Sequence, residues 1–148
     1  MTLFETPWDF DHKKIFNNKI IEYSDVQEIV QGGPEIGKLS IDNKTFEEKL
    51  FGGPCLNHGE FIYLPVYLRK FLNRGFQLCR INLFSRKLDI LTSFEDLIYL
   101  DRIENNKIYY YIDLEKNKLK NCALPGKSCP LLILSLLDQP MLPTLWFL

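Results

Sequence analysis

Apolar and polar residues alternate along much of this chain with the period of two that is typical of β-strands. The pattern is densest over residues 60–114, where apolar segments are separated by Asn-Arg-Gly, Ser-Arg-Lys and Asn-Asn. Asn, Gly and Ser favour chain reversal. We therefore predict a β-meander over 60–114, around which the rest of the chain is organised.

The segments before this meander are shorter. Residues 13–23 predict a hairpin, because Asn17-Asn18 tolerates the positive φ that a two-residue primed turn needs. Ser-x-x-Gln at 24–27 and Thr-x-x-Glu at 45–48 have the spacing of capping boxes and predict one or two short helices. A Gly-Gly-Pro turn follows each, so both helices are expected to end there.

The apolar run 61–68 has apolar side chains on both faces of the expected strand. Either both faces are covered by other parts of the protein, or one is available to a partner. Pro65 cannot donate a ladder hydrogen bond, so this strand is expected at a sheet edge or with a bulge.

The last hairpin of the meander, 97–104 with 107–114, can be placed in register. A two-residue Asn105-Asn106 loop pairs Arg102 with Tyr109 and, further along, Asp101 with Tyr110 and Leu100 with Tyr111. The expected core face then holds Leu97, Tyr99, Ile103, Ile108, Tyr110, Ile112 and Leu114, interrupted by Asp101. The expected outer face holds Ile98, Leu100, Arg102, Glu104, Lys107, Tyr109, Tyr111 and Asp113.

Size and charge narrow the function classes. The 148 residues are expected to form a single domain, 1–148, with an N-terminal arm at 1–12 and an apolar C-terminal segment at 123–148. Lys and Arg number 18 against 19 Asp and Glu, so no global field attracts nucleic acid, which ranks second to protein as an expected partner. The first residues lack the apolar core of a signal peptide, which favours a cytoplasmic location with reduced cysteines.

The C-terminal segment is mostly apolar, but Asp138 and three neighbouring polar or proline residues interrupt it. A membrane span needs about 20 continuous apolar residues, so no span is expected. The segment is expected to be a last buried element, or to contact a partner or a second copy of the chain.

Candidate catalytic chemistry is sparse. Cys55 and His58 form the only thiol and imidazole neighbours and leave a small Cys/His-dependent hydrolase or transferase as the enzymatic alternative. Cys122 and Cys129 are separated by six residues, where zinc sites have two to four. His12 beside Asp9 and Asp11 fits a solvated arm. No metal or cofactor is expected.

The outer face of the last hairpin is the stronger candidate. It combines tyrosines with an arginine, the residue types that anchor protein interfaces. The binding residues predicted from it are Arg102, Glu104, Tyr109, Tyr111 and Asp113.

The near-neutral, Asn-, Lys- and Ile-rich composition, the Gly-Gly-Pro turns, the strand 61–65 and the meander through Tyr111 together resemble the small cytoplasmic immunity proteins of bacterial contact-dependent toxin systems. The likeness covers about residues 8–121 in general character, and no motif aligns that would transfer a site residue. It implies a protein that binds one toxin domain and blocks its active site without doing chemistry. The expected protein is thus mainly β, an antiparallel sandwich or partly open barrel with one or two short helices, acting as a non-enzymatic protein-binding module.

Overall fold

The computed structural model of this protein describes residues 4–70 and 73–126. Within these ranges the chain is all-β and contains no helix. The strands are β1 (Lys13–Phe16), β2 (Lys19–Glu28), β3 (Glu35–Ile41), β4 (Lys44–Thr45), β5 (Leu50–Phe51), β6 (Leu56–His58), β7 (Phe61–Lys70), β8 (Asn73–Asn82), β9 (Leu88–Ile90), β10 (Tyr99–Glu104), β11 (Lys107–Tyr111) and β12 (Leu119–Ala123).

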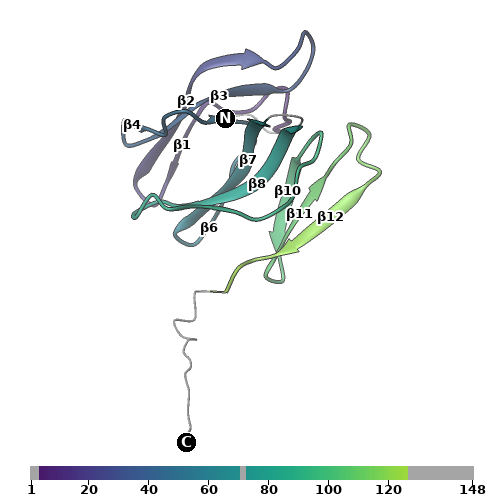
Figure 1. The fold of residues 1–148 in the computed structure, drawn as a ribbon. Coiled ribbons are helices and arrows are strands. Elements are labelled where there is room, and N and C mark those ends of the chain that lie inside the picture. Colours follow the sequence, from purple (N-terminus) through teal and green to yellow (C-terminus); the bar gives the residue numbers. More distant parts are fainter. Residues whose placement is uncertain (1–3, 71–72, 127–148) are drawn as a thin grey trace, which may run out of the picture.

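The strands form two antiparallel sheets (Figure 1). The larger has the order β1-β2-β3-β5-β7-β8-β9, with β4 beside β3 and β6 beside β7, and the smaller has the order β10-β11-β12. Only one residue pair, Gly37 with Phe51, joins β3 to β5. The larger sheet therefore divides into a β1–β3 part and a β7–β9 part, and neither sheet closes into a barrel. The expected antiparallel β architecture is confirmed.

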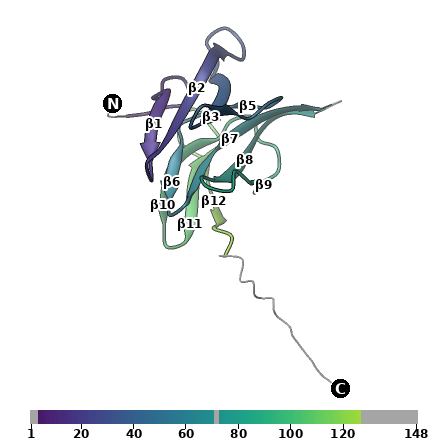
Figure 2. The ribbon, with the colours of Figure 1, turned by 90° about the vertical axis from the view of Figure 1, so that its left-hand side faces the viewer.

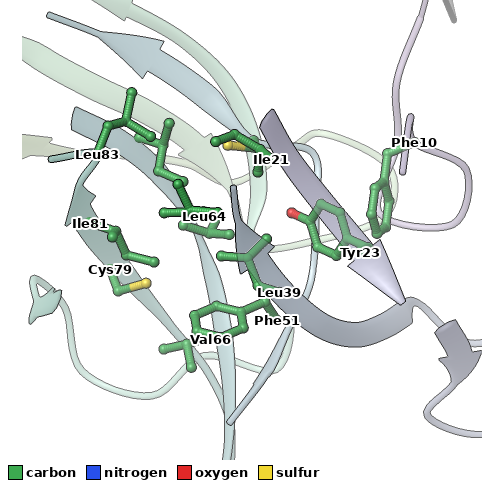
Figure 3. Packing of buried hydrophobic residues seen from close by; sticks show 13 residues of the cluster. Phe10, Ile21, Tyr23, Leu39, Phe51, Leu64, Val66, Cys79, Ile81 and Leu83 are labelled. Carbon is green, nitrogen blue, oxygen red and sulfur yellow. The ribbon is translucent and has the colours of Figure 1, made fainter. Parts of the chain in front are cut away.

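The first hydrophobic core lies between these two parts of the larger sheet. Figure 3 shows side chains of β2 and β3, such as Ile21 and Leu39, meeting Leu64 and Val66 of β7. Phe10 of the N-terminal arm also packs into this core and is 3 % exposed. Burial of these apolar side chains holds the two parts of the sheet face to face.

The second core lies on the opposite face of β7 and β8. There Tyr63 and Leu78 contact the three-stranded sheet through Leu100, Ile108 and Tyr110. In Figures 1 and 2, β7 and β8 accordingly run between the β1–β3 part and the β10–β12 sheet. Alternate residues of β7 enter different cores, so the protein's own chain covers both apolar faces of 61–68.

The two expected helices are wrong. Residues 24–28 continue β2, with a bulge near Asp25, whose φ is 51°. Residues 45–50 form the end of β4, a turn with Glu48 at a φ of 62°, and the start of β5. A capping box is a local signal, and pairing with β3 outweighs it here, as tertiary contacts commonly override local propensity.

Of the two alternatives expected for β7, an edge position or a bulge at Pro65, the edge position is wrong, and the ladder with β8 runs through Pro65 without a register shift. β8 pairs with one side of β7 over its whole length, and β5 and β6 pair with the other side. Residues 52–55, which contain the second Gly-Gly-Pro turn, stand between β5 and β6 opposite Leu64 and Pro65. The ladder is thus interrupted beside Pro65, and the Pro65 carbonyl still accepts the Gly52 N–H at 2.9 Å.

Both Asn-Asn turns are confirmed as two-residue loops. All four asparagines have a positive φ, between 52° and 62°. The resulting pairs are Ile15 with Ile20 in the first hairpin and Ile103 with Ile108 in the last. The side-chain amide of asparagine makes this backbone conformation accessible where most residues avoid it.

The register of the last hairpin is confirmed only up to Arg102, which pairs with Tyr109 as predicted. A bulge at Asp101 then brings Leu100 opposite Tyr110 and Tyr99 opposite Tyr111. The predicted pairs would have placed the Asp101 carboxylate in the core, and an uncompensated buried charge is costly. The bulge leaves Asp101 exposed, turns Leu100 inward and turns Tyr99 outward, the reverse of the predicted faces.

Two further expectations about 60–114 need correction. The segment is not one meander, because β7–β9 belong to the larger sheet and β10–β11 to the smaller. Leu114, expected in the core, is 58 % exposed, whereas Ile98, expected outside, is 1 % exposed. The third strand of the smaller sheet, β12, was not predicted, because Leu-Lys-Asn-Cys-Ala has little apolar alternation and forms a strand by pairing with β11.

Candidate interaction surface

The outer face of the three-stranded sheet, on the side away from β7 and β8, carries a cluster of tyrosines and charged residues. We define the outer face by its members: Tyr99, Arg102, Glu104, Lys107, Tyr109, Tyr111, Leu119 and Asn121. These positions alternate with the buried Ile108 and Tyr110, which are 0 % and 4 % exposed. Because successive side chains of a strand point to opposite faces, the outer side chains project away from the core. Among the described residues, no further strand or helix covers them.

Arg102 and Tyr109 form the centre of this face. The guanidinium carbon of Arg102 lies 4.3 Å from the centroid of the Tyr109 ring. Its Nε donates a hydrogen bond to Glu104 Oε1 at 3.0 Å, and a second guanidinium nitrogen is paired with Asp101. The hydrogen bonds that Arg102 donates to Glu104 and Asp101 raise its pKa above the usual arginine value. Two carboxylates therefore fix the guanidinium over the ring.

Tyr99 and Tyr111 form a second aromatic group at the other end of this face. Their ring centroids are 6.4 Å apart and the ring planes meet at 72°. Trp8 from the N-terminal arm adds a third ring, 6.4 Å from Tyr99 and edge-on to it. The Nζ of Lys116, in the β11–β12 loop, lies 4.7 Å from the Tyr99 centroid and 5.9 Å from that of Tyr111.

The structure thus brings together four of the five predicted binding residues: Arg102, Glu104, Tyr109 and Tyr111. Asp113 lies in the β11–β12 loop, where its carboxylate accepts the backbone N–H groups of Asn117 and Lys118 at 2.9–3.0 Å. Its carboxylate therefore shapes the loop that carries Lys116.

Sequence reasoning missed Leu119 and Asn121, which lie on the unpredicted strand β12, and three residues of the aromatic group, Tyr99, Trp8 and Lys116. Tyr99 was placed in the core by the register without the bulge, and Trp8 and Lys116 lie outside the predicted hairpin strands. The signal that could have found Tyr99 is Asp101 itself, since a carboxylate in an otherwise apolar row indicates a register shift.

Cys55 and His58 are not arranged as a nucleophile and its base. Cys55 is 3 % exposed in the first core, and burial raises the pKa of its thiol to about 12. His58 is exposed at the end of β6. A nucleophilic cysteine needs a lowered pKa and access to substrate, which this environment does not supply.

His58 does line a hollow of ≈ 650 Å³ together with Glu60, Phe61, Tyr63 and Arg80, at the edge of the β7–β8 layer. Arg80 is already engaged there: its guanidinium stacks 4.2 Å from the Phe61 centroid, and Nε donates to Asp89 at 3.1 Å. The hollow therefore offers an imidazole and a carboxylate but no accessible thiol.

Metal-ligating clusters of three or more acidic, histidine or cysteine residues do not occur in the described ranges 4–70 and 73–126. His12, one candidate from the sequence, instead contacts Glu35 at 3.2 Å. Cys55, Cys79 and Cys122 are thiols, and Cys129 lies outside the described residues.

None of the described residues forms a helix long and apolar enough to cross a membrane. Residues 127–148 of the expected apolar C-terminal segment 123–148 also lie outside the described ranges, so its burial or self-association stays a prediction.

Comparison of the chain with protein-family models, with curated proteins and with solved structures gives no significant match.

Proposed function

We propose that this protein is a non-enzymatic protein-binding module that uses the outer face of β10–β12 to hold its partner. The observation that carries the proposal is the Arg102–Tyr109 stack, which Asp101 and Glu104 hold in place on an exposed sheet face. Arginine and tyrosine are enriched among the residues that dominate interface energetics. Side chains that are already ordered lose less conformational entropy on binding.

The specific form of the proposal is an immunity protein that neutralises a cognate toxin in the cytoplasm of a bacterium. The general resemblance of the sequence supports it, and so does the aromatic character of the outer face. Charges of both signs lie on and beside that face: Arg102, Lys107 and Glu104 belong to it, and Asp101 lies next to it in the bulge. This balance suits a folded protein partner better than a polyanion, which would require a basic surface.

The enzymatic alternative, a hydrolase or transferase using Cys55 and His58, has weaker support. The thiol is enclosed in an apolar core and its pKa is raised. A binding surface does not require a thiol with a lowered pKa. The binding proposal also accounts for the exposed aromatic and charged side chains of the outer face, which the enzymatic alternative leaves unexplained.

Coexpression with the product of a neighbouring gene that inhibits growth on its own tests the proposal. The protein should restore growth and co-purify with the toxin in a fixed ratio. Replacing both Arg102 and Tyr109 with alanine should weaken the complex by about 10-fold or more, because truncation of an interface anchor costs about 2 kcal/mol or more.

The matched control is the pair Lys19 and Phe84, a second cation–π pair with Nζ 5.3 Å from the ring centroid, in which Phe84 is exposed and Lys19 is half-buried and paired with Asp42. Replacing both with alanine should leave binding unchanged. Equal weakening by the two double variants, or unaltered binding of the Arg102 and Tyr109 variant, would contradict the proposed surface. Growth inhibition that persists despite a stable folded protein would contradict the immunity function.

A further inference from the structure

We propose that Tyr99 and Tyr111 form an aromatic binding site for a cationic side chain of the partner, and that Lys116 occupies this site in the unbound protein. The inference rests on the proposed function in one respect, namely that the cationic ligand is a side chain of a protein partner. The recognition chemistry itself follows from the geometry of the rings and can be tested without the partner.

The two rings form adjacent walls of one corner. Their planes meet at 72° with the centroids 6.4 Å apart, and Trp8 stands edge-on to Tyr99 at the same distance. The face of an aromatic ring carries negative potential and attracts a cation within about 6 Å of its centroid. Lys116 Nζ lies within that distance of both tyrosines, so one cation is shared by two ring faces.

Lys116 differs from Arg102, the cation that stacks on Tyr109 of the outer face. Arg102 is paired with two carboxylates, Asp101 and Glu104, in addition to its contact with Tyr109. Lys116 has no carboxylate partner among the residues that the structure describes, and it is exposed. Its ammonium group can therefore return to water at little cost, whereas displacing Arg102 would break two ion pairs.

The loop around Lys116 supports this role. Lys116 has a φ of 59°, a conformation that lysine rarely adopts. The Asp113 carboxylate holds the loop by accepting the N–H groups of Asn117 and Lys118. The backbone thus keeps Lys116 beside the rings while its side chain extends over them. A lysine or arginine of the partner would replace it with the same charge and the same ring contacts.

The test uses choline, a quaternary ammonium compound, and 3,3-dimethylbutanol, a neutral molecule of the same shape. A W146F background makes Trp8, next to Tyr99, the only tryptophan of the chain. Trp8 fluorescence is then titrated with each compound in three full-length proteins: the background, the background with K116A, and the background with K116A and Y111L.

We expect saturable quenching or a spectral shift with choline and a much weaker response to the neutral compound. Removing Lys116 should lower the half-saturating choline concentration about two- to fivefold, which is the competition expected from an exposed cation–π contact. Adding Y111L to K116A should abolish this gain in choline affinity. Leucine is apolar and suits a strand, and circular dichroism and a thermal melt confirm that each variant is folded.

Equal responses to choline and to the neutral compound, or an identical choline affinity with and without Lys116, would overturn the inference. The outcomes also separate it from the proposed function. If the protein neutralises its toxin through Arg102 and Tyr109 but shows no choline response, the proposed function stands and the cation site is refuted. If it binds choline as expected but has no protein partner, the cation site stands and the proposed function is refuted.

Discussion

Leu100 lies directly opposite Tyr110 in the β10–β11 ladder, and both side chains enter the core shared with β7 and β8. This pairing exists because Asp101 is accommodated in a bulge. It reverses the faces of Leu100 and Tyr99 and so decides which tyrosines reach the outer face. The bulge is therefore the feature that links the fold to the candidate interaction surface.

This register can be tested by comparing two truncations on neighbouring residues. Leu100→Ala should lower the free energy of unfolding by about 2–4 kcal/mol, because Leu100 is 3 % exposed and the truncation leaves a cavity. Tyr99→Ala should cost about 1 kcal/mol, since it removes mainly edge-on contacts with Trp8 and Tyr111. Urea denaturation measures both. A larger loss for Tyr99 than for Leu100 would contradict the bulged register.

Gly75 is a second sensitive position, located in β8. Its φ is 148°, and a Cβ placed there would lie 2.8 Å from the Glu95 carbonyl oxygen, next to the Phe76–Glu95 bridge. Gly75→Ala should therefore destabilise the protein by about 2 kcal/mol or more, through both the clash and the strained backbone.

Gly59 provides the matched control for this substitution, because it has a φ of 61° with no atom within 4 Å of the added Cβ. Gly59→Ala should show the backbone strain alone, about 1 kcal/mol. Thermal or urea unfolding of both variants gives the difference, which combines the clash with the greater backbone strain of a φ of 148°. Equal losses would indicate that the connection carrying Glu95 moves aside freely.

The buried thiols predict a loss of stability in alkaline solution. Burial raises the pKa of Cys55 from 9.0 to about 12 and that of Cys79 in the same direction. Above pH 9 the unfolded chain loses these protons while the native protein keeps them. The stabilisation is therefore complete below pH 9 and is lost as the pH rises through the native pKa.

Cys79→Ala isolates one of these thiols. Between pH 9 and 10.5, the free energy of unfolding of the unsubstituted protein should fall more steeply than that of the variant, by up to about 1.4 kcal/mol per pH unit. The variant is less stable at every pH because of lost packing, so the slope is the informative measurement. Parallel curves for the two proteins would show that Cys79 titrates normally in the native state.

The Arg102–Tyr109 contact should be measurable without any partner. A double-mutant cycle with Arg102→Ala and Tyr109→Ala should give a coupling energy of about 0.5–1 kcal/mol, as expected for an exposed cation–π pair. Arg102 and Phe84 serve as the reference pair, because they share no partner: Phe84 contacts Lys19, whereas Arg102 contacts Tyr109, Asp101 and Glu104. Their coupling should not exceed about 0.3–0.5 kcal/mol. A coupling energy of zero between Arg102 and Tyr109 would contradict the proposal that this pair is preorganised for binding.

Local patterns in the sequence were sufficient for much of this structure. The two Asn-Asn turns have positive φ values and the alternating segments around them form antiparallel strands. The pairing of Arg102 with Tyr109 followed from the length of the loop alone, because a two-residue turn fixes the register next to it. These features depend on residues close together in the chain, so their signals are visible without the fold.

Tertiary structure decided the remaining features, because these features depend on which distant part of the chain packs against each segment. The helices expected from capping boxes became strands through pairing with β3, and the doubly apolar strand β7 found a core on each face. Asp101 could not be buried, so a bulge placed Tyr99 beside Tyr111, within reach of Trp8 from the far end of the chain and of Lys116. The sequence by itself determined the strands and turns of the two Asn-Asn hairpins and a group of tyrosines on the second of them. Only long-range packing, through the cost of burying a charge and the gain from covering apolar faces, decided which side chains form the outer surface.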